Sequence, residues 1–187
     1  NRPNSYNSLN AKMAKELLEI SYECDTNKKI RAIILTGEGD RAFCAGGDLK
    51  SFHETGNVAK HLKMVTHDLH GAITKFSRMN SPLIVAVNGV AAGAGLSFVG
   101  FADLAIAKSS ATFVSAYTKA GLTPDGSSSY YLPRIIGLRK YLELVMTNKL
   151  LSSEEALAWG LLNKVYDDKK FWSETLKLAD DLSKGPT

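Results

Sequence analysis

The stretch LIVAVNGVAAGAGLS, residues 83–97, decides the fold class. Leu83 to Val87 is an apolar, β-branched run that predicts a buried strand. After a turn, the small residues from Gly93 to Phe101 predict a buried helix. A buried strand that leads directly into a buried helix is typical of α/β proteins, whose parallel strands are covered on both faces.

The same alternation extends in both directions along the chain. Ile30 to Thr36 predicts another buried strand, and Ser152 with Glu155 has the spacing of a capping box at the start of a helix. Further helices are predicted at residues 8–24, 62–79, 138–145 and 171–182, and short strands at 104–107 and 111–114. We find no linker, so we expect one α/β domain over residues 1–187 with a largely parallel sheet.

The composition is that of an ordinary globular protein, because 44% of the 187 residues are hydrophobic and 22% are charged. The net charge is +4, but no dense basic tract points to nucleic acid as a partner. The two cysteines, Cys24 and Cys44, suggest neither a disulfide framework nor a zinc site. A reducing compartment fits best, so we expect a cytoplasmic protein, or one of the mitochondrial matrix or peroxisome if the source is eukaryotic.

One uncharged stretch, residues 79–102, is long enough to span a bilayer. Pro82, Asn88 and several glycines interrupt it, and its first half is β-rich while its second half consists of small residues. We therefore interpret it as a strand followed by a helix and expect no membrane segment and no signal peptide.

Residues 42–50, AFCAGGDLK, are the first of three segments suited to chemistry. Gly46 and Gly47 let the main chain turn tightly and approach a ligand. Asp48 can cap a following helix whose free N–H groups point back at the glycines. The segment fits a backbone-donor site for an oxyanion, and it equally fits a plain turn with a capping aspartate.

Residues 88–97, NGVAAGAGLS, are the second segment. Gly93 and Ala94 lie where a helix begins, so the helix dipole would add to the N–H donors. The segment half-matches a dinucleotide-binding fingerprint, but Phe98 replaces the third glycine and no acidic residue follows at the expected distance. A Rossmann-type dehydrogenase is therefore only a distant alternative.

Residues 121–134, GLTPDGSSSYYLPR, are the third segment. The run from Thr123 to Gly126 has strong turn chemistry, with proline, aspartate and glycine in suitable positions. Asp125 can belong to the turn, cap the following helix, or serve as a catalytic carboxylate.

These three segments, in this order, resemble the crotonase superfamily of enoyl-CoA hydratases and isomerases. The resemblance covers nearly the whole chain and includes LSSEEALAWGLLNKV, residues 151–165. It implies a crotonase-like spiral of ββα units, acyl-CoA thioester substrates, and assembly as a homotrimer or dimer of trimers. It also implies that an N-terminal hairpin and a C-terminal helical tail are missing, so that the chain represents a core domain.

The resemblance assigns roles to the glycine-rich segments. It implies that the backbone N–H groups of Gly47 and Ala94 hold the thioester oxygen, and that Ala45 lies by the CoA adenine. Asp48 and Gly93 belong to the same two substrate-binding turns. Coenzyme A would be present only as part of the substrate, with no other cofactor and no metal.

The chain departs from the hydratase pattern at two positions. Hydratases of the family use two glutamates, and the corresponding residues here are Ser97 and Tyr117, which we expect to line the acyl pocket. Asp125 lies where several isomerases of the family carry an acid, so it offers a single carboxylate to move a proton along the acyl chain. We therefore expect an enoyl-CoA isomerase, with a hydratase or a non-catalytic acyl-CoA-binding module as alternatives.

Two histidines, His67 and His70, lie three residues apart on a predicted helix. That spacing can suit a metal, but no carboxylate or cysteine completes a set. We interpret both as part of a solvated helix face and expect no metal site.

Overall fold

The computed structural model describes residues 1–185. Its strands are β1 (Ile33–Thr36), β2 (Ala42–Cys44), β3 (Leu83–Val87), β4 (Val90–Ala92), β5 (Leu104–Lys108), β6 (Thr112–Val114), β7 (Leu151–Ser152) and β8 (Lys164–Tyr166). Its helices are α1 (Ala11–Thr26), α2 (Leu49–His53), α3 (Val58–Phe76), α4 (Ala94–Phe101), α5 (Ser128–Ile136), α6 (Leu138–Thr147), α7 (Ser153–Ala158) and α8 (Phe171–Ser183). Short 3-10 helices occur at Pro3–Ser5 and Thr118–Ala120.

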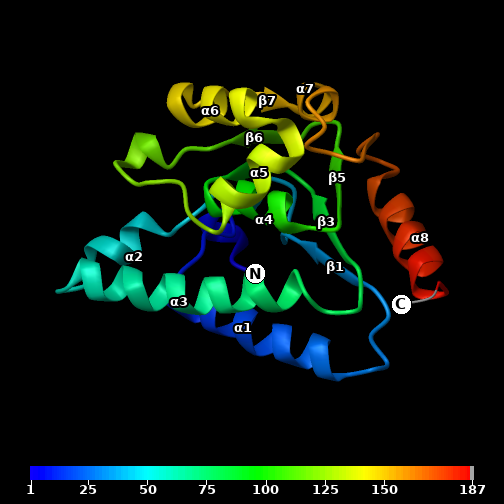
Figure 1. Ribbon diagram of the computed structural model, residues 1–187, viewed down its shortest axis with the longest axis horizontal. Helices are drawn as coiled ribbons and strands as arrows, with labels where there is room; N and C mark the ends of the chain where they lie inside the picture. The colour runs from blue at the N-terminus through cyan, green and yellow to red at the C-terminus, as the bar shows by residue number, and fades with distance from the viewer. Residues whose placement is uncertain (186–187) are drawn as a thin grey trace.

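The strands form two four-stranded sheets, in the orders β1-β3-β5-β8 and β2-β4-β6-β7 (Figure 1). All pairs in the first sheet are parallel, and in the second only β6 and β7 are antiparallel. Three times in succession the chain passes from a strand of the first sheet to a strand of the second and then into helix. This is the spiral of ββα units that the sequence resemblance implied.

The predicted largely parallel pairing is confirmed, but the strands form two sheets where the sequence predicted one. The turns after β1, β3 and β5 are short, and each moves the chain into the second sheet instead of directly into a helix. The extra strands β2 and β4 have three residues each and lie inside the glycine-containing segments. Such short strands carry no readable two-residue period.

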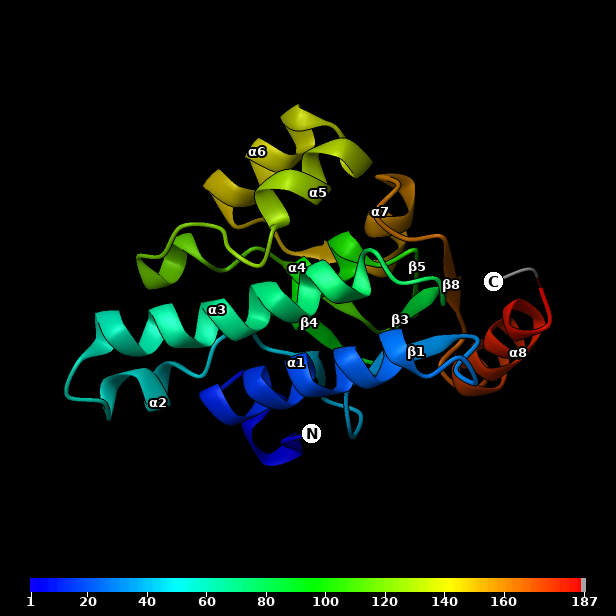
Figure 2. The same ribbon diagram turned by 60° about the horizontal axis from the view of Figure 1, so that its bottom comes forward.

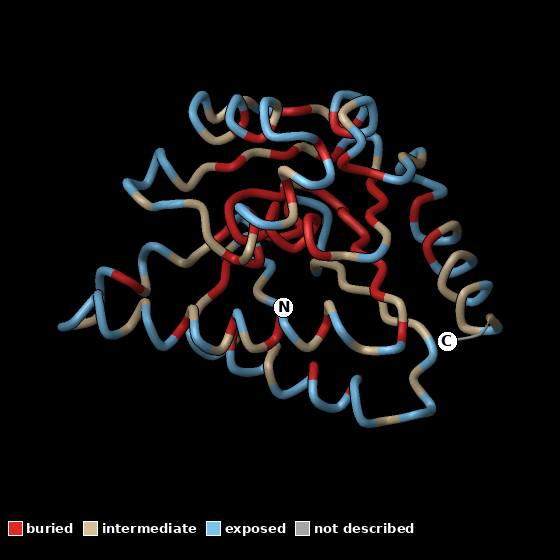
Figure 3. Tube along the Cα trace, in the orientation of Figure 1, coloured by how far each residue is buried: buried red, intermediate tan, exposed pale blue. Residues whose placement is uncertain are grey.

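Strand β3 explains why its sequence is apolar at every position. It lies between β1 and β5, and all five residues are buried. Leu83, Val85 and Val87 join the main core, whereas Ile84 and Ala86 face a second cluster that includes Phe171 of α8. Side chains alternate across a strand, so both faces of the first sheet are covered. Figure 3 shows the buried residues concentrated on these central strands and α4.

Helices α1 and α3 lie side by side (Figures 1 and 2). The buried face of α3 consists of Val65, Leu69, Ala72, Ile73 and Phe76, in agreement with the predicted apolar stripe. The helix begins at Val58, four residues before the predicted start, because the Asn57 side chain caps it by accepting from the Lys60 N–H.

The capping box predicted at Ser152 is confirmed. The Ser152 hydroxyl accepts from the Glu155 N–H at 3.2 Å, and the Glu155 carboxylate accepts from the Ser152 N–H at 3.0 Å. Within the described part of the chain, no helix has the length and apolar character needed to cross a membrane. The uncharged stretch at residues 79–102 instead contains β3, β4 and α4.

Candidate active site

The two glycine turns meet at the carboxyl ends of the neighbouring parallel strands β2 and β4. Gly46 has φ +97°, and a Cβ atom placed on it would lie 3.1 Å from the carbonyl oxygen of Ala92. Gly93 has φ +53°, and its Cβ would lie 3.4 Å from the Gly46 Cα. Both positive φ values favour glycine, and both distances show main chain packed against main chain. The sequence therefore needs small residues here so that the two turns can touch.

The backbone N–H of Gly47 lies between two hydrogen bonds to Leu9. The Leu9 N–H donates to the Gly46 carbonyl at 2.7 Å, and the Asp48 N–H donates to the Leu9 carbonyl at 2.9 Å. This parallel bridge uses the main-chain groups on either side of Gly47. Among residues 1–185, no group accepts a hydrogen bond from the Gly47 N–H itself.

Ala94 is the first residue of α4, and Gly93 precedes it without a side-chain cap. The first N–H groups of a helix have no partner within the helix. The Ala94 N–H has no acceptor elsewhere in the described chain either. Gly47 and Ala94 line the same cavity, so the structure brings together two unpaired N–H donors at the place where the sequence predicted an oxyanion site.

The cavity has a volume of about 130 Å³ and is mainly apolar. An engineered apolar cavity of roughly 150 Å³ is large enough to bind benzene, so this one can hold a short acyl chain or a single ring. Its walls come from the segment before α1, from α2 and α3, and from the loop before α5. The apolar side chains in its lining include Leu9, Leu49, Phe52, Leu62, Val65, Leu69 and Leu122.

Asp125 is the carboxylate at this cavity. It is the only acidic residue among the described residues that line it. Its side chain is 34% exposed, and its Oδ1 lies 2.7 Å from His70 Nε2. Asp125 does not cap α5, because the N-cap is Ser127 and no side-chain hydrogen bond caps that helix. The capping alternative is therefore wrong, and the carboxylate faces α3.

His70 is a site residue that the sequence analysis missed, since it was assigned to a solvated helix face. Its side chain is 47% exposed but is paired with Asp125. Leu62, Thr66 and Leu69 of the same helix line the cavity, and His70 lies four residues after Thr66, on the same face. The four-residue spacing from Thr66 to His70 is the sequence signal that could have identified His70.

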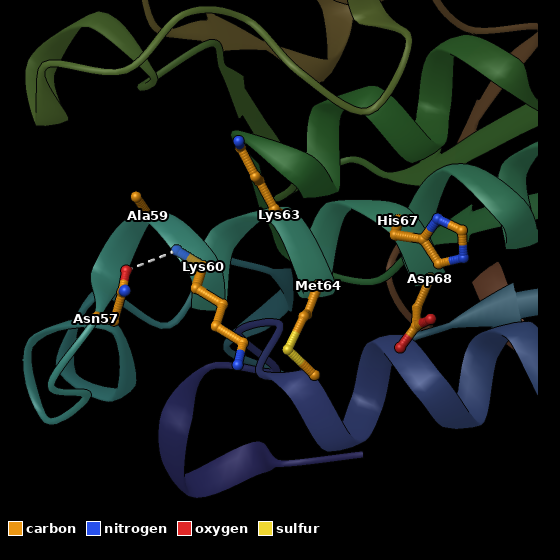
Figure 4. Close-up of a pocket in the computed structure, with 7 residues that line it drawn as sticks. All are labelled: Asn57, Ala59, Lys60, Lys63, Met64, His67 and Asp68. Atoms are coloured by element: carbon orange, nitrogen blue, oxygen red, sulfur yellow. Dashed lines mark hydrogen bonds between the residues drawn. The ribbon is translucent and has the colours of Figure 1, made fainter.

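His67 lies one turn before His70 on α3 but lines a different hollow. It lines an open depression on the outer side of α3, shown in Figure 4. The lining there comes from one helix and its cap, namely Asn57, Ala59, Lys60, Lys63, Met64, His67 and Asp68. This depression includes neither glycine turn. Within residues 1–185, no three histidine, cysteine, aspartate or glutamate side chains gather as a metal site.

Ser97 and Tyr117 lie together beside the Asp125 turn. Ser97 Oγ is 2.9 Å from Tyr117 Oη and 2.9 Å from the Asp125 carbonyl oxygen. Tyr117 lines the cavity, whereas Ser97 is buried behind it. Burial raises the pKa of the Tyr117 phenol above its usual range, so Tyr117 stays neutral and cannot act as a base near neutral pH.

The remaining predicted residues lie around the Gly46–Gly47 turn. Ala45 lines the exposed mouth of the cavity. Asp48 caps α2 by accepting from the Ser51 N–H at 3.2 Å, and it pairs with Arg2 at 2.7 Å. It is not among the residues that line the cavity. Burial raises the pKa of the Cys44 thiol to about 11, in keeping with a packing role.

Comparisons with known proteins point to the same family as the sequence resemblance. A family model described as enoyl-CoA hydratase/isomerase matches residues 1–187. The chain is 36% identical to the 4-chlorobenzoyl coenzyme A dehalogenase-2 of Arthrobacter sp, covering 100% of this chain and 68% of that protein. It is also 36% identical to the 1,2-epoxyphenylacetyl-CoA isomerase of Escherichia coli K12, covering 100% of this chain and 72% of that protein.

Solved structures agree with the sequence comparisons. The crystal structure of an enoyl-CoA hydratase from Bacillus anthracis matches with a TM-score of 0.93 at 28% identity, over 99% of this chain and 71% of that one. The full-length family match, the relatives above 30% identity and the shared fold agree with one another. The chain therefore belongs to the enoyl-CoA hydratase/isomerase family, within the crotonase superfamily.

Proposed function

We propose that this protein acts on acyl-CoA thioesters and shifts a double bond between the β,γ and α,β positions of the acyl chain. The observation that carries the proposal is the placement of the Asp125 carboxylate at the cavity that also contains the N–H groups of Gly47 and Ala94. These are the groups that enolate chemistry requires, one base and two donors.

The two N–H groups would stabilise the enolate. Removal of a proton beside a thioester places negative charge on its oxygen, and donors fixed in advance around that oxygen stabilise the charge without reorganisation. Each such donor contributes about 2.7–4 kcal/mol in well-studied oxyanion sites. The apolar wall strengthens the interaction because it keeps water away.

Asp125 would move the proton. One carboxylate suffices, because the proton removed from one carbon of the dienolate system can be returned to another carbon on the same side. Water addition is less suited to this cavity, since Ser97 and Tyr117 occupy the positions of the two hydratase glutamates. The proposal requires no group beyond the coenzyme A of the substrate, and it includes the homotrimer or dimer of trimers that the resemblance implies.

The direct test is Asp125→Asn, which keeps the shape of the side chain and removes the base. We expect isomerisation of 3-hexenoyl-CoA, followed by ultraviolet absorbance of the conjugated product, to fall by about 10²–10⁴. Asp68→Asn, on the outer side of α3, is the matched control and should keep wild-type activity. Unchanged turnover by Asp125→Asn would remove Asp125 from the mechanism, and rapid hydration of crotonyl-CoA by the wild type would favour the hydratase alternative.

A second candidate function is hydrolytic removal of a halide from an aromatic acyl thioester. Two observations favour it: the His70–Asp125 contact at 2.7 Å, and the 36% identity to a protein named as a 4-chlorobenzoyl-CoA dehalogenase. A carboxylate can act as a nucleophile, so Asp125 would displace chloride from the ring and form an aryl ester. Water activated by His70 would then cleave that ester. Chloride release from 4-chlorobenzoyl-CoA without any isomerisation of 3-hexenoyl-CoA would replace the first proposal with this one.

A further inference from the structure

The hydroxyls of Ser97 and Tyr117 form a chain whose proton positions follow from the distances. Ser97 Oγ lies 2.9 Å from the Tyr117 hydroxyl, 2.9 Å from the Asp125 carbonyl oxygen, and 3.2 Å from the Gly93 carbonyl oxygen. Each of the two close oxygen–oxygen contacts needs a proton between its atoms, because two oxygens without one repel each other. The carbonyl cannot supply a proton, so the two hydroxyls must.

Only one arrangement places a proton in both contacts. The Ser97 hydroxyl donates to the Asp125 carbonyl, and the Tyr117 hydroxyl donates to Ser97. If Ser97 donated to Tyr117 instead, the 2.9 Å contact between Ser97 and Asp125 would contain no proton. The single proton of Tyr117 is therefore committed to Ser97, away from the cavity.

The oxygen of Tyr117 lies next to the reacting region. A Cβ placed on Gly93 would be 4.0 Å from Tyr117 Cζ, and one placed on Gly126 would be 3.7 Å from Tyr117 Oη. The hydroxyl end of Tyr117 is thus between the Ala94 turn and the Asp125 turn. Because Tyr117 lines the cavity, its oxygen can accept a hydrogen bond there while its proton goes to Ser97.

We propose that Tyr117 presents a hydrogen-bond acceptor to the acyl group and so selects acyl thioesters that carry a hydroxyl at the γ carbon. The γ carbon is the position implied because Asp125, which Tyr117 adjoins, is proposed to move a proton between the α and γ carbons. This inference rests on the proposed function and adds a substrate class to it. An acceptor-only group at the same carbon, such as a ketone, would meet the Tyr117 lone pair and be disfavoured.

The test compares three five-carbon thioesters that differ only at C4: pentanoyl-CoA, 4-hydroxypentanoyl-CoA and 4-oxopentanoyl-CoA. Dissociation constants are measured by titration calorimetry on the wild type, Tyr117→Phe and Ser97→Ala. We expect the wild type to bind the 4-hydroxy thioester about tenfold more tightly than the 4-oxo thioester, the size of one net hydrogen bond. Tyr117→Phe should bring that ratio close to one, whereas Tyr131→Phe, at another half-buried tyrosine, should leave it unchanged.

Ser97→Ala tests whether the Tyr117 hydroxyl donates its proton to Ser97. Without its acceptor, the Tyr117 proton becomes free to turn towards the cavity, so the preference should shift towards the 4-oxo thioester. Three outcomes overturn this inference: equal binding of the hydroxy and oxo thioesters by the wild type, a preference that survives in Tyr117→Phe, or a preference that is unchanged in Ser97→Ala. In each case, binding of pentanoyl-CoA by the wild type still supports the proposed function. Failure of all three thioesters to bind the wild type overturns both.

Discussion

The main-chain half of the site and the side-chain half are held in place by different means. The N–H groups of Gly47 and Ala94 lie in turns that end β2 and begin α4, and the turns touch through Gly46 and Gly93. Asp125 and His70, by contrast, are side chains that are 34% and 47% exposed, on a loop and the surface of α3. The position of the donors is therefore fixed by the sheet, whereas the carboxylate can be lost or moved by one substitution.

This difference suggests how one fold supports several named activities among its relatives. Stabilisation of a thioester oxygen needs only the backbone, and it survives changes in the surrounding side chains. The choice of reaction depends on which acidic, basic or hydroxyl side chains reach the bound acyl group. If this division holds, substitutions in the two halves should have different consequences for activity and for stability.

After that of Asp125→Asn, the largest effect is expected when one donor is removed. Ala94→Pro deletes the N–H at the first position of α4, where proline is compatible with a helix. We expect kcat/KM for isomerisation to fall by about 10²–10³ with the helix retained. Ala94→Ser keeps the N–H and is the control, and full activity in the proline variant would show that this donor does not contact the substrate.

The second effect concerns stability. Gly46→Ala places a side chain at φ +97° and 3.1 Å from the Ala92 carbonyl, and we expect it to lower the free energy of unfolding by about 1–3 kcal/mol. Asp125→Asn, at a partly exposed loop residue, should change it by about 0.5 kcal/mol or less. Urea denaturation measures both, and equal effects would contradict the division between the two halves.

The third effect is that of His70→Ala. His70 is the only side chain among residues 1–185 whose hydrogen bond to the Asp125 carboxylate is observed, so its loss should leave the carboxylate less well oriented. We expect kcat to fall about tenfold, less than the ~10²–10⁴ expected for Asp125→Asn. His67→Ala, on the outer side of the same helix, should match the wild type. A His70→Ala variant as impaired as Asp125→Asn would give His70 a direct part in the chemistry.

The smallest effect is pH-dependent and concerns Asp48, beside the first turn. Burial raises the pKa of the Asp48 carboxyl. The charge and hydrogen bond of Arg2, together with the hydrogen bond from the Ser51 backbone, outweigh burial and hold the pKa below its usual value. Because the folded-state pKa is the lower one, ionised Asp48 stabilises the fold above a pH of about 4. That stabilisation is lost as the pH falls through the folded-state pKa.

Asp48→Asn can still cap α2 but loses the ion pair. We expect the free energy of unfolding near neutral pH to decrease by about 0.5–1 kcal/mol, and the difference from wild type to shrink in acid. Urea denaturation at several pH values measures it. A difference that is constant with pH would mean that the Arg2 contact does not contribute.

The sequence predicted those parts of the fold that have a clear pattern. Strand β3 was predicted with its observed bounds, because a short, β-branched, apolar run is typical of a strand that is covered on both faces. Strands β2 and β4 were missed as strands because three residues show no period, although the glycine turns that follow them were recognised. The early start of α3 depends on a cap at Asn57 and not on an apolar residue.

The site was predictable to a similar degree. Gly47, Ala94 and Asp125 were selected from local sequence and resemblance, and all three line one cavity. His70 was missed because its partner lies 55 positions away, so that only its helical spacing from Thr66 could have indicated it. The direction of the hydrogen bonds made by the Ser97 and Tyr117 hydroxyls can be deduced only from oxygen–oxygen distances, which a sequence does not contain.

The bridge between Leu9 and Gly47 has a practical consequence for anyone who engineers this protein. The peptide plane that orients one donor is anchored by Leu9, which lies in the segment ahead of the first long helix. Shortening the chain past residue 9 would release that anchor while both sheets remained intact. Such a variant would fold and pass a thermal-shift screen, yet the Gly47 N–H would no longer be held in the orientation on which turnover depends.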